Sequence, residues 1–122
     1  MSRQPIDSAP APPDWALECI EAFVGHLERE RDRSAHTIRA YAGDVRACLA
    51  WCAADGADDL GDVTLQQLRA WLGELSAGGA ARATLSRRSA AVRTFFAWAR
   101  RSGRVEADPA LRLTSPKRQR TL

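Results

Sequence analysis

The sequence has few of the features that mark secreted, membrane-bound or metal-binding chains. Its three cysteines, Cys19, Cys48 and Cys52, form no CxxC pair and have no histidine at metal-ligand spacing, so neither a disulfide framework nor a zinc site is expected. No apolar run approaches the roughly 18–20 residues of a membrane span, and the N-terminus has no apolar signal segment. We therefore expect no membrane partner and a reducing, cytoplasmic setting.

The motifs of the common catalytic classes are also missing. There is no GxxxxGK[ST] loop, no HExxH, no GxSxG and no Gly-rich dinucleotide turn. The two histidines, His26 and His36, fall on different predicted helices, and a single helical histidine is usually a surface or capping residue. The one tyrosine, Tyr41, is expected on a core-facing side and is interpreted as a packing residue. We expect no cofactor and no catalysis from this stretch of chain.

Composition divides the 122 residues into three parts. Residues 1–13 are rich in proline, alanine and serine and are expected to be a disordered leader. Residues 14–108 have regular hydrophobic spacing and are expected to form one domain, because a single core suits about 100–150 residues. Residues 109–122 are predicted to be a basic linker, which includes Lys117 and is still running where the sequence stops.

Four segments carry apolar residues at helical spacing, whereas no segment has the alternation of a strand. The helices are expected at about residues 15–31, 35–54, 65–77 and 83–102. The expected fold is therefore all-α, a four-helix bundle. The residues expected to face its core are Leu17, Ile20, Phe23, Val24, Leu27, Ile38, Tyr41, Val45, Leu49, Cys52, Leu65, Leu68, Trp71, Leu72, Leu75, Leu85, Val92, Phe95, Phe96 and Ala99.

Short polar residues and glycines mark the ends of these helices. Asp14 and Ser34 are predicted to cap the first and second helices, because their side chains accept hydrogen bonds from free backbone N–H groups. Thr64 and Gln67 have the spacing of a capping box at the start of the third helix. Gly103 is expected to end the fourth.

Charge is distributed unevenly along the chain. Residues 1–81 hold 7 of the 18 lysines and arginines and 13 of the 15 acidic residues, for a formal charge of −6, whereas residues 82–122 carry +9. Such asymmetry favours an anionic partner, and nucleic acid more than a membrane, because no basic segment has a large apolar face. A solvated helix face followed by a basic tail is the alternative.

The second predicted helix has a polar row opposite its apolar stripe. His36, Arg39 and Arg46 alternate there with very small residues, including Gly43. Glycine inside a helix costs about 1 kcal/mol relative to alanine, so Gly43 requires an explanation. Either a tight helix crossing or close approach of a DNA backbone would supply one.

The fourth predicted helix has arginines and small hydroxyls on its outer arc, and the chain has no acid between residues 82 and 102. A solvated face usually mixes both signs, so this arc favours a phosphate-facing surface. With hydroxyls near the start of the second helix, the candidate DNA contacts are Ser34, His36, Thr37, Arg39, Arg46, Arg82, Ser86, Arg87, Arg93 and Lys117.

The order and spacing of these residues resemble a known family. The chain is similar to the N-terminal core-binding domain of Xer-type tyrosine recombinases, and within them to the XerC branch, over about residues 15–122. The matching runs are Ser34-x-x-Thr37-x-x-x-Tyr41-x-x-Asp44-Val45, Thr84-Leu85 with Arg87 or Arg88 after it, Ala91-Val92-Arg93-x-Phe95-Phe96-x-Trp98, Asp108-Pro109 and Ser115-Pro116-Lys117.

This resemblance implies a four-helix SAM-like orthogonal bundle that clamps one face of duplex DNA, with its second and fourth helices in the groove. It assigns core roles to Tyr41, Val92 and Phe96 and leaves Asp44 open, an ion pair with a nearby arginine being one option. The residues that it assigns to DNA contact are Ser34, Thr37, Arg39, Arg82, Ser86, Arg87 and Arg93.

The resemblance also implies a parent enzyme. The family's catalytic arginines, lysine, histidine and nucleophilic tyrosine lie beyond the Pro-Lys linker, and this sequence ends at Leu122. The implied reaction is transesterification through a 3′-phosphotyrosyl link without a cofactor. Similar enzymes act as tetramers with a second recombinase subunit and resolve chromosome dimers before division.

Three other functions fit parts of the sequence. A phage or transposon integrase would share the fold and recombine mobile DNA. A helical adaptor would use the basic arc to bind an acidic protein. A helix-turn-helix repressor fits less well, because the second and fourth helices are not joined by the short turn of that motif.

Overall fold

The computed structural model describes residues 11–30 and 32–116, and all of its long elements are helices. In chain order these are α1 (Asp14–Glu28), α2 (Ala35–Ala54), the short 3-10 helix η2 (Leu60–Asp62), α3 (Leu65–Ala77) and α4 (Arg82–Arg101). No strand occurs among the described residues. The expected all-α, four-helix fold is confirmed.

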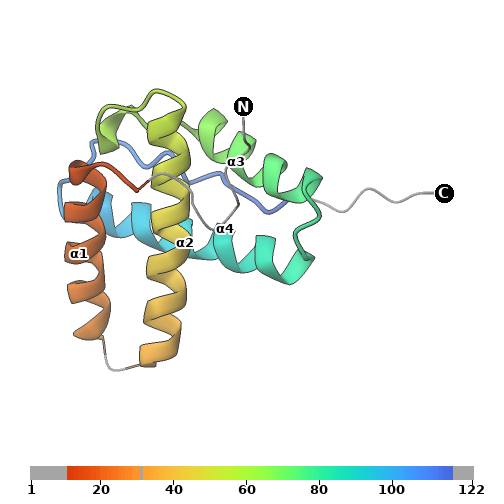
Figure 1. The fold of residues 1–122 in the computed structure, drawn as a ribbon. Helices are drawn as coiled ribbons and strands as arrows, with labels where there is room; N and C mark the ends of the chain where they lie inside the picture. The colour runs from red at the N-terminus through yellow and green to blue at the C-terminus, as the bar shows by residue number, and fades with distance from the viewer. Residues whose placement is uncertain (1–10, 31, 117–122) are drawn as a thin grey trace.

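The four helices pack as two pairs that cross (Figure 1). α1 and α2 lie side by side and run antiparallel, α3 and α4 form the second antiparallel pair, and α4 passes behind α2 at a steep angle. α2 contacts each of the other three long helices, and α4 contacts both α2 and α3. The face where α2 crosses α4 is therefore held at the centre of the molecule.

The predicted ends of three helices agree with the structure to within one residue. The Ser34 side chain accepts a hydrogen bond from the Thr37 N–H at the start of α2, and Thr64 with Gln67 forms the predicted capping box of α3. Gly103 follows α4 with a φ of 76°, a left-handed conformation that favours glycine. Side-chain capping at α2 and α3 and a glycine after α4 were sufficient to locate these ends.

The first helix differs from the prediction at both ends. α1 begins at Asp14 itself after Pro13, and no side chain caps it, so the prediction that Asp14 is the N-cap was wrong. Proline fixes its own φ and precedes a helix readily, which leaves Asp14 in the first turn beside the positive end of the helix. At the other end, Arg29 and Glu30 donate to carbonyls three residues back, and this tightening ends the helix at Glu28.

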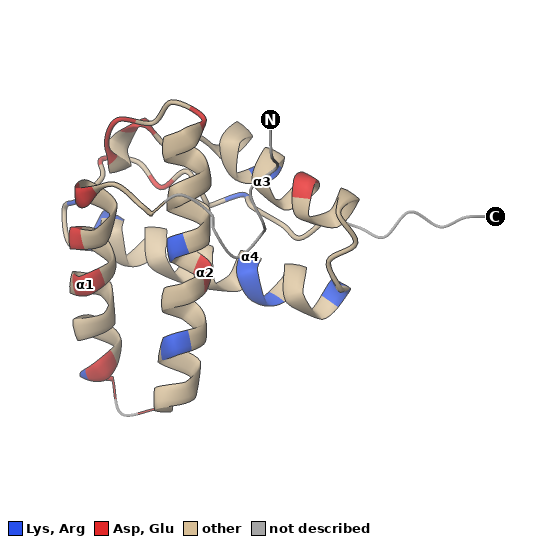
Figure 2. Cartoon of the chain, viewed as in Figure 1, with Lys and Arg blue, Asp and Glu red and all other residues tan. Residues whose placement is uncertain are grey.

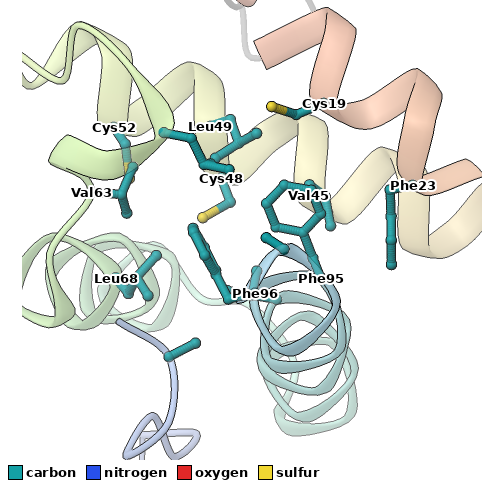
Figure 3. Close-up of a cluster of buried hydrophobic side chains, with 14 of the residues drawn as sticks. Cys19, Phe23, Val45, Cys48, Leu49, Cys52, Val63, Leu68, Phe95 and Phe96 are labelled. Atoms are coloured by element: carbon teal, nitrogen blue, oxygen red, sulfur yellow. The ribbon is translucent and has the colours of Figure 1, made fainter. Parts of the chain in front are cut away.

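The core is aromatic at its centre (Figure 3). Phe23 of α1 meets Phe95 of α4 edge to face, with ring centroids 5.2 Å apart, and Phe95 meets Phe96 in the same way at 5.0 Å. Cys48, which lies beside Phe96, and Cys52, which was predicted to face the core, are both fully buried. The predicted inward positions of α4 are all buried, whereas five others are only partly buried: Leu17, Val24, Tyr41, Leu65 and Leu75.

Two irregular segments complete the core, and neither was predicted in detail. Ala57, Leu60 and Val63 are buried around η2, whose first turn is capped by Asp59. After α4 the chain folds back, and Val105, Ala110 and Leu113 are buried as well. The Asp108 side chain accepts from the Ala110 N–H at 2.8 Å, a hydrogen bond that stabilises the turn through Pro109.

Residues at the two ends of the chain test the predicted boundaries only in part. Of the expected leader at 1–13, only residues 11–13 are described, and Lys117 lies outside the described residues together with the rest of the predicted linker beyond Pro116. The candidate contact at Lys117 therefore stays a prediction.

Candidate nucleic-acid interface

The basic row predicted on α2 lies at the surface. His36, Arg39 and Arg46 are exposed, and so is Gly43 between the two arginines. A Cβ atom built on Gly43 would meet nothing within 4 Å in the described part of the chain. The tight helix crossing that we considered for Gly43 is thus wrong. Because Gly43 has no side chain, the strip of α2 surface between Arg39 and Arg46 is open to a partner.

The predicted residues of α4 are also at the surface. Arg82, Ser86, Arg87 and Arg93 are all exposed. The structure does not, however, direct them to one place. Arg87 reaches toward α2, whereas Arg93 donates from Nη1 to the Leu113 carbonyl oxygen at 3.0 Å, in the segment that follows α4.

Arg87 and Asp44 form an ion pair at the crossing of α2 and α4. The guanidinium donates from Nε to one carboxylate oxygen at 2.9 Å and from Nη2 to the other at 2.8 Å. The Asp44 side chain is only 3% exposed, whereas that of Arg87 is 47% exposed. These hydrogen bonds raise the pKa of Arg87 above its ordinary value. Of the alternatives for Asp44, the ion pair is the one that the structure shows.

Arg88 is a second arginine near the same carboxylate, and its role was left open by the sequence. Its Nε lies 3.5 Å from Asp44 Oδ1 but is buried without a hydrogen-bond partner among the described residues. Its guanidinium also lies over the Trp71 ring of α3, 5.8 Å from the centroid. The one feature of the sequence that could have pointed to these ion pairs is Asp44 itself, because it is the single acidic residue in the segment 35–54.

The start of α2 presents two hydroxyls that are partly used within the protein. Ser34 accepts from the Thr37 N–H at 3.1 Å and donates its hydroxyl to Thr37 Oγ1 at 3.0 Å. Ser34 is exposed and Thr37 half-buried. The Thr37 hydroxyl hydrogen is left for an outside acceptor, near the positive end of the helix dipole.

Acidic residues gather on another part of the molecule (Figure 2). Among the described residues, α1 and the turn around η2 carry several carboxylates and no arginine, whereas α2 and α4 carry eight of the thirteen arginines and a single carboxylate, that of Asp44. Glu18 of α1 forms an ion pair with Arg104, which lies in the segment after α4, at 2.9 Å. The acidic and basic charges thus lie mainly on different elements, but the division differs from the one predicted along the chain, because α2 belongs to residues 1–81 and is itself basic.

The histidines and the tyrosine form no common site. His26 lies 3.0 Å from Glu30 in an ion-pair geometry, His36 is exposed on another helix, and Tyr41 is half-buried under the Arg33 guanidinium. Burial raises the pKa of the Cys48 thiol well above its usual value, which disfavours the thiolate. No group of three metal-ligating side chains was found within residues 11–30 and 32–116.

Every helix in the described part of the chain is too short or too polar to cross a bilayer.

Comparisons with known proteins agree with the architecture. The family described as "Phage integrase, N-terminal SAM-like domain" matches residues 20–103. The protein named Tyrosine recombinase XerC from Mycobacterium sp. (strain KMS) is 53% identical over 105 residues, which are 84% of this chain and 35% of that protein. The protein of the same name from Mycobacterium tuberculosis (strain ATCC 25177 / H37Ra) is 47% identical over 103 residues.

A solved structure has the same fold. The integrase from mycobacterium phage Brujita superposes with a TM-score of 0.68 at 20% identity, over 89% of this chain and 35% of that one. The chain thus spans about a third of the length of the relatives that it matches. Both comparisons confirm the expected SAM-like bundle.

Proposed function

The chain belongs to the phage integrase N-terminal SAM-like domain family, and from that premise we propose that it binds duplex DNA as the core-binding domain of a Xer-type tyrosine recombinase. The family membership and the XerC relatives support a recombinase core-binding domain. DNA as the ligand rests on the charges of α2 and α4.

One observation carries this proposal. α2 and α4 together contain eight arginines and one carboxylate, that of Asp44, which is buried and already paired. A phosphate backbone that approached these helices would therefore meet exposed cations and no exposed carboxylate of α2 or α4. Neutralising phosphates releases counterions, which is the main source of affinity for such surfaces.

The two helices offer different contacts to the duplex. On α2, Arg39 and Arg46 flank the open strip at Gly43. The missing side chain there allows the sugar-phosphate backbone of DNA to come close to the helix backbone. At its start, the Thr37 hydroxyl and the helix dipole suit a phosphate oxygen. On α4, Arg82 and Ser86 add a cation and a hydroxyl. The remaining candidates are His36, Ser34, Arg87, Arg93 and Lys117.

The parent activity is part of the same proposal. In a full recombinase, a tyrosine outside this stretch attacks a DNA phosphate and forms a 3′-phosphotyrosyl link, while cations stabilise the transition state. This domain contributes DNA binding and no catalytic residue. It acts beside a second recombinase subunit in a cytoplasmic tetramer on DNA. Because the relatives carry the name Tyrosine recombinase XerC, the parent reaction that we propose is chromosome dimer resolution, with integration of mobile DNA as the alternative.

Salt-dependent binding tests the proposal. We expect the 122-residue chain to bind a mixed-sequence duplex with an affinity that falls linearly on a log–log plot against salt. Replacing both Arg39 and Arg46 by Ala should weaken binding and flatten the slope by roughly 2, because each neutralised phosphate contributes about one. Arg69→Ala, an exposed arginine of α3, is the matched control.

Two outcomes would reject DNA binding. One is an affinity and slope that the double variant leaves unchanged. The other is capture of an acidic protein from cell extract that persists after nuclease treatment while duplex binding is absent, which would favour a helical adaptor.

A further inference from the structure

We infer that Asp44 is a positioning residue for DNA binding, which fixes the Arg87 guanidinium so that its outer edge meets a hydrogen-bond acceptor of the duplex. This inference rests on the proposed function, since it names how one residue of the same surface is prepared. Asp44 itself contacts no DNA, because it is 3% exposed and lies beneath the arginine.

The geometry of the pair leaves Arg87 half available. Asp44 takes the hydrogens of Nε and one hydrogen of Nη2, at 2.9 and 2.8 Å. A guanidinium has five N–H donors, so Nη1 and the second hydrogen of Nη2 remain for another acceptor. With the Arg87 side chain 47% exposed, these donors lie on the side away from the buried carboxylate. The side-on pairing thus selects which edge of the arginine faces outward.

Immobilising the arginine in advance favours binding. A free arginine side chain loses considerable rotamer entropy when it is fixed against a ligand, and a preorganised guanidinium loses less. In this protein the rotamer entropy of Arg87 is already lost on folding, because the bidentate charge-assisted pair with Asp44 holds the guanidinium in place. Arg87 is therefore better prepared than an arginine that moves freely in solvent.

The surroundings of Asp44 supply a second observation. Gly43 immediately precedes it and is exposed, and a methyl group at this position would have nothing within 4 Å among the described residues. A helix position that lacks a side chain beside a fixed guanidinium leaves room for a DNA strand to approach closely. The helix-propensity cost of Gly43 is then explained by access and not by packing.

Electrostatics alone makes the opposite prediction. Removing a carboxylate next to a polyanion should tighten binding, since the local charge becomes more positive. A positioning role predicts weaker binding, because Arg87 loses its fixed orientation. The sign of the change therefore separates the two explanations.

The first experiment uses two isosteric variants, Asp44→Asn on α2 and Glu18→Gln on α1, each of which removes one negative charge. We expect Asp44→Asn to weaken binding of a mixed-sequence duplex of about 30 base pairs on the order of tenfold, the loss typical of one arginine contact. Glu18→Gln should stay within about twofold of the wild type. Circular dichroism at the binding temperature confirms that both are folded. Tighter or unchanged binding by folded Asp44→Asn would overturn the inference.

A double-mutant cycle then tests whether Asp44 acts through Arg87. In the Arg87→Ala background, Asp44→Asn should cause no further loss. An equal loss in both backgrounds would show an independent structural effect and would also overturn the inference. If Asp44→Asn does not fold, Arg87→Lys tests the positioning role instead, because it keeps the charge but loses the bidentate geometry. We expect it to bind DNA about as weakly as Arg87→Ala. Wild-type affinity would count against a positioning role.

A last arm identifies the acceptor. Arginine pairs with phosphate oxygens on any sequence but with O6 and N7 only of guanine. Persistence of the Asp44→Asn loss on a duplex of A·T pairs assigns a phosphate, and its disappearance there assigns a guanine edge. If the wild-type chain shows no salt-dependent duplex binding at all, the proposed function fails instead, whatever the variants do.

Discussion

Two arginine–carboxylate ion pairs in this molecule have nearly equal lengths but very different exposure to solvent. Arg87 and Asp44 join α4 to α2 at 2.8 Å, and Arg104 and Glu18 join the segment after α4 to α1 at 2.9 Å. The Asp44 side chain is 3% exposed, whereas that of Glu18 is 64% exposed. Distance alone would rank them as equals.

Burial makes the difference between them. When Arg104 is removed, Glu18 is solvated by water, so the pair contributes little beyond screened Coulomb energy. When Arg87 is removed, the Asp44 carboxylate stays inside with one poorly aligned arginine, and it keeps its desolvation cost. Breaking the buried pair should therefore cost more free energy of unfolding than breaking the exposed pair. The buried pair also lies between α2 and α4, the two helices that carry most of the described arginines.

The largest effect is expected for Arg87→Ala. It should lower the free energy of unfolding by about 2 kcal/mol, because a buried carboxylate loses two charge-assisted hydrogen bonds. Urea denaturation followed by circular dichroism measures this. A change as small as that of Glu18→Gln would show that Arg88 compensates fully and would remove the contrast between the pairs.

Arg88→Ala should have an intermediate effect, of about 1 kcal/mol. The substitution loses a 3.5 Å approach to Asp44 and the contact with the Trp71 ring, but it also removes a buried Nε without a hydrogen-bond partner in the described chain. The same denaturation experiment applies. A loss larger than that of Arg87→Ala would make Arg88 the main support of Asp44.

Gly43→Ala should act in the opposite direction. We expect a gain of about 0.5–1 kcal/mol in the free energy of unfolding, because alanine favours the helix and its Cβ meets no atom of the described residues within 4 Å. Binding to duplex DNA should weaken at the same time. A variant that is more stable and binds as well as the wild type would show that DNA does not approach this strip closely.

The smallest effect is expected for Glu18→Gln, at most about 0.5 kcal/mol. Its thermal midpoint should fall by no more than a degree or two relative to the wild type, and this small residual shift should diminish at high salt, where surface charges are screened. A loss comparable to that of Arg87→Ala would show that exposure does not distinguish the two pairs.

The sequence was most informative where short-range chemistry decides the structure. The starts of α2 and α3 follow from Ser34 and from Thr64 with Gln67, and the inward residues of α4 follow from the period of about 3.6 residues. At α1 the same reasoning failed, because Pro13 supplied the helix start without a side-chain cap. A proline and an aspartate at adjacent positions compete for that role, and their sequence order does not decide it.

Contacts between distant segments were beyond the sequence. Asp44 and Arg87 are 43 positions apart, and whether Arg87 or Arg88 takes the bidentate position depends on how α4 rotates against α2. Arg82 and Arg93 were predicted on one arc, yet Arg93 is directed to Leu113 by a chain reversal that periodicity does not describe. The candidate surface was predictable as a list of residues, but its internal pairing was not.

The buried thiols give the protein reporter groups that need no engineering. Cys48 lies one helical turn after Asp44 in the sealed interior, whereas Cys19 is next to Glu18 and 3.9 Å from Arg104 Nη1. A thiol reagent in solution can modify each sulfur only while the surrounding structure is open. The rate of alkylation at Cys19 would thus time the local fraying of α1, and that at Cys48 the full opening of the domain, in one sample and with the natural sequence.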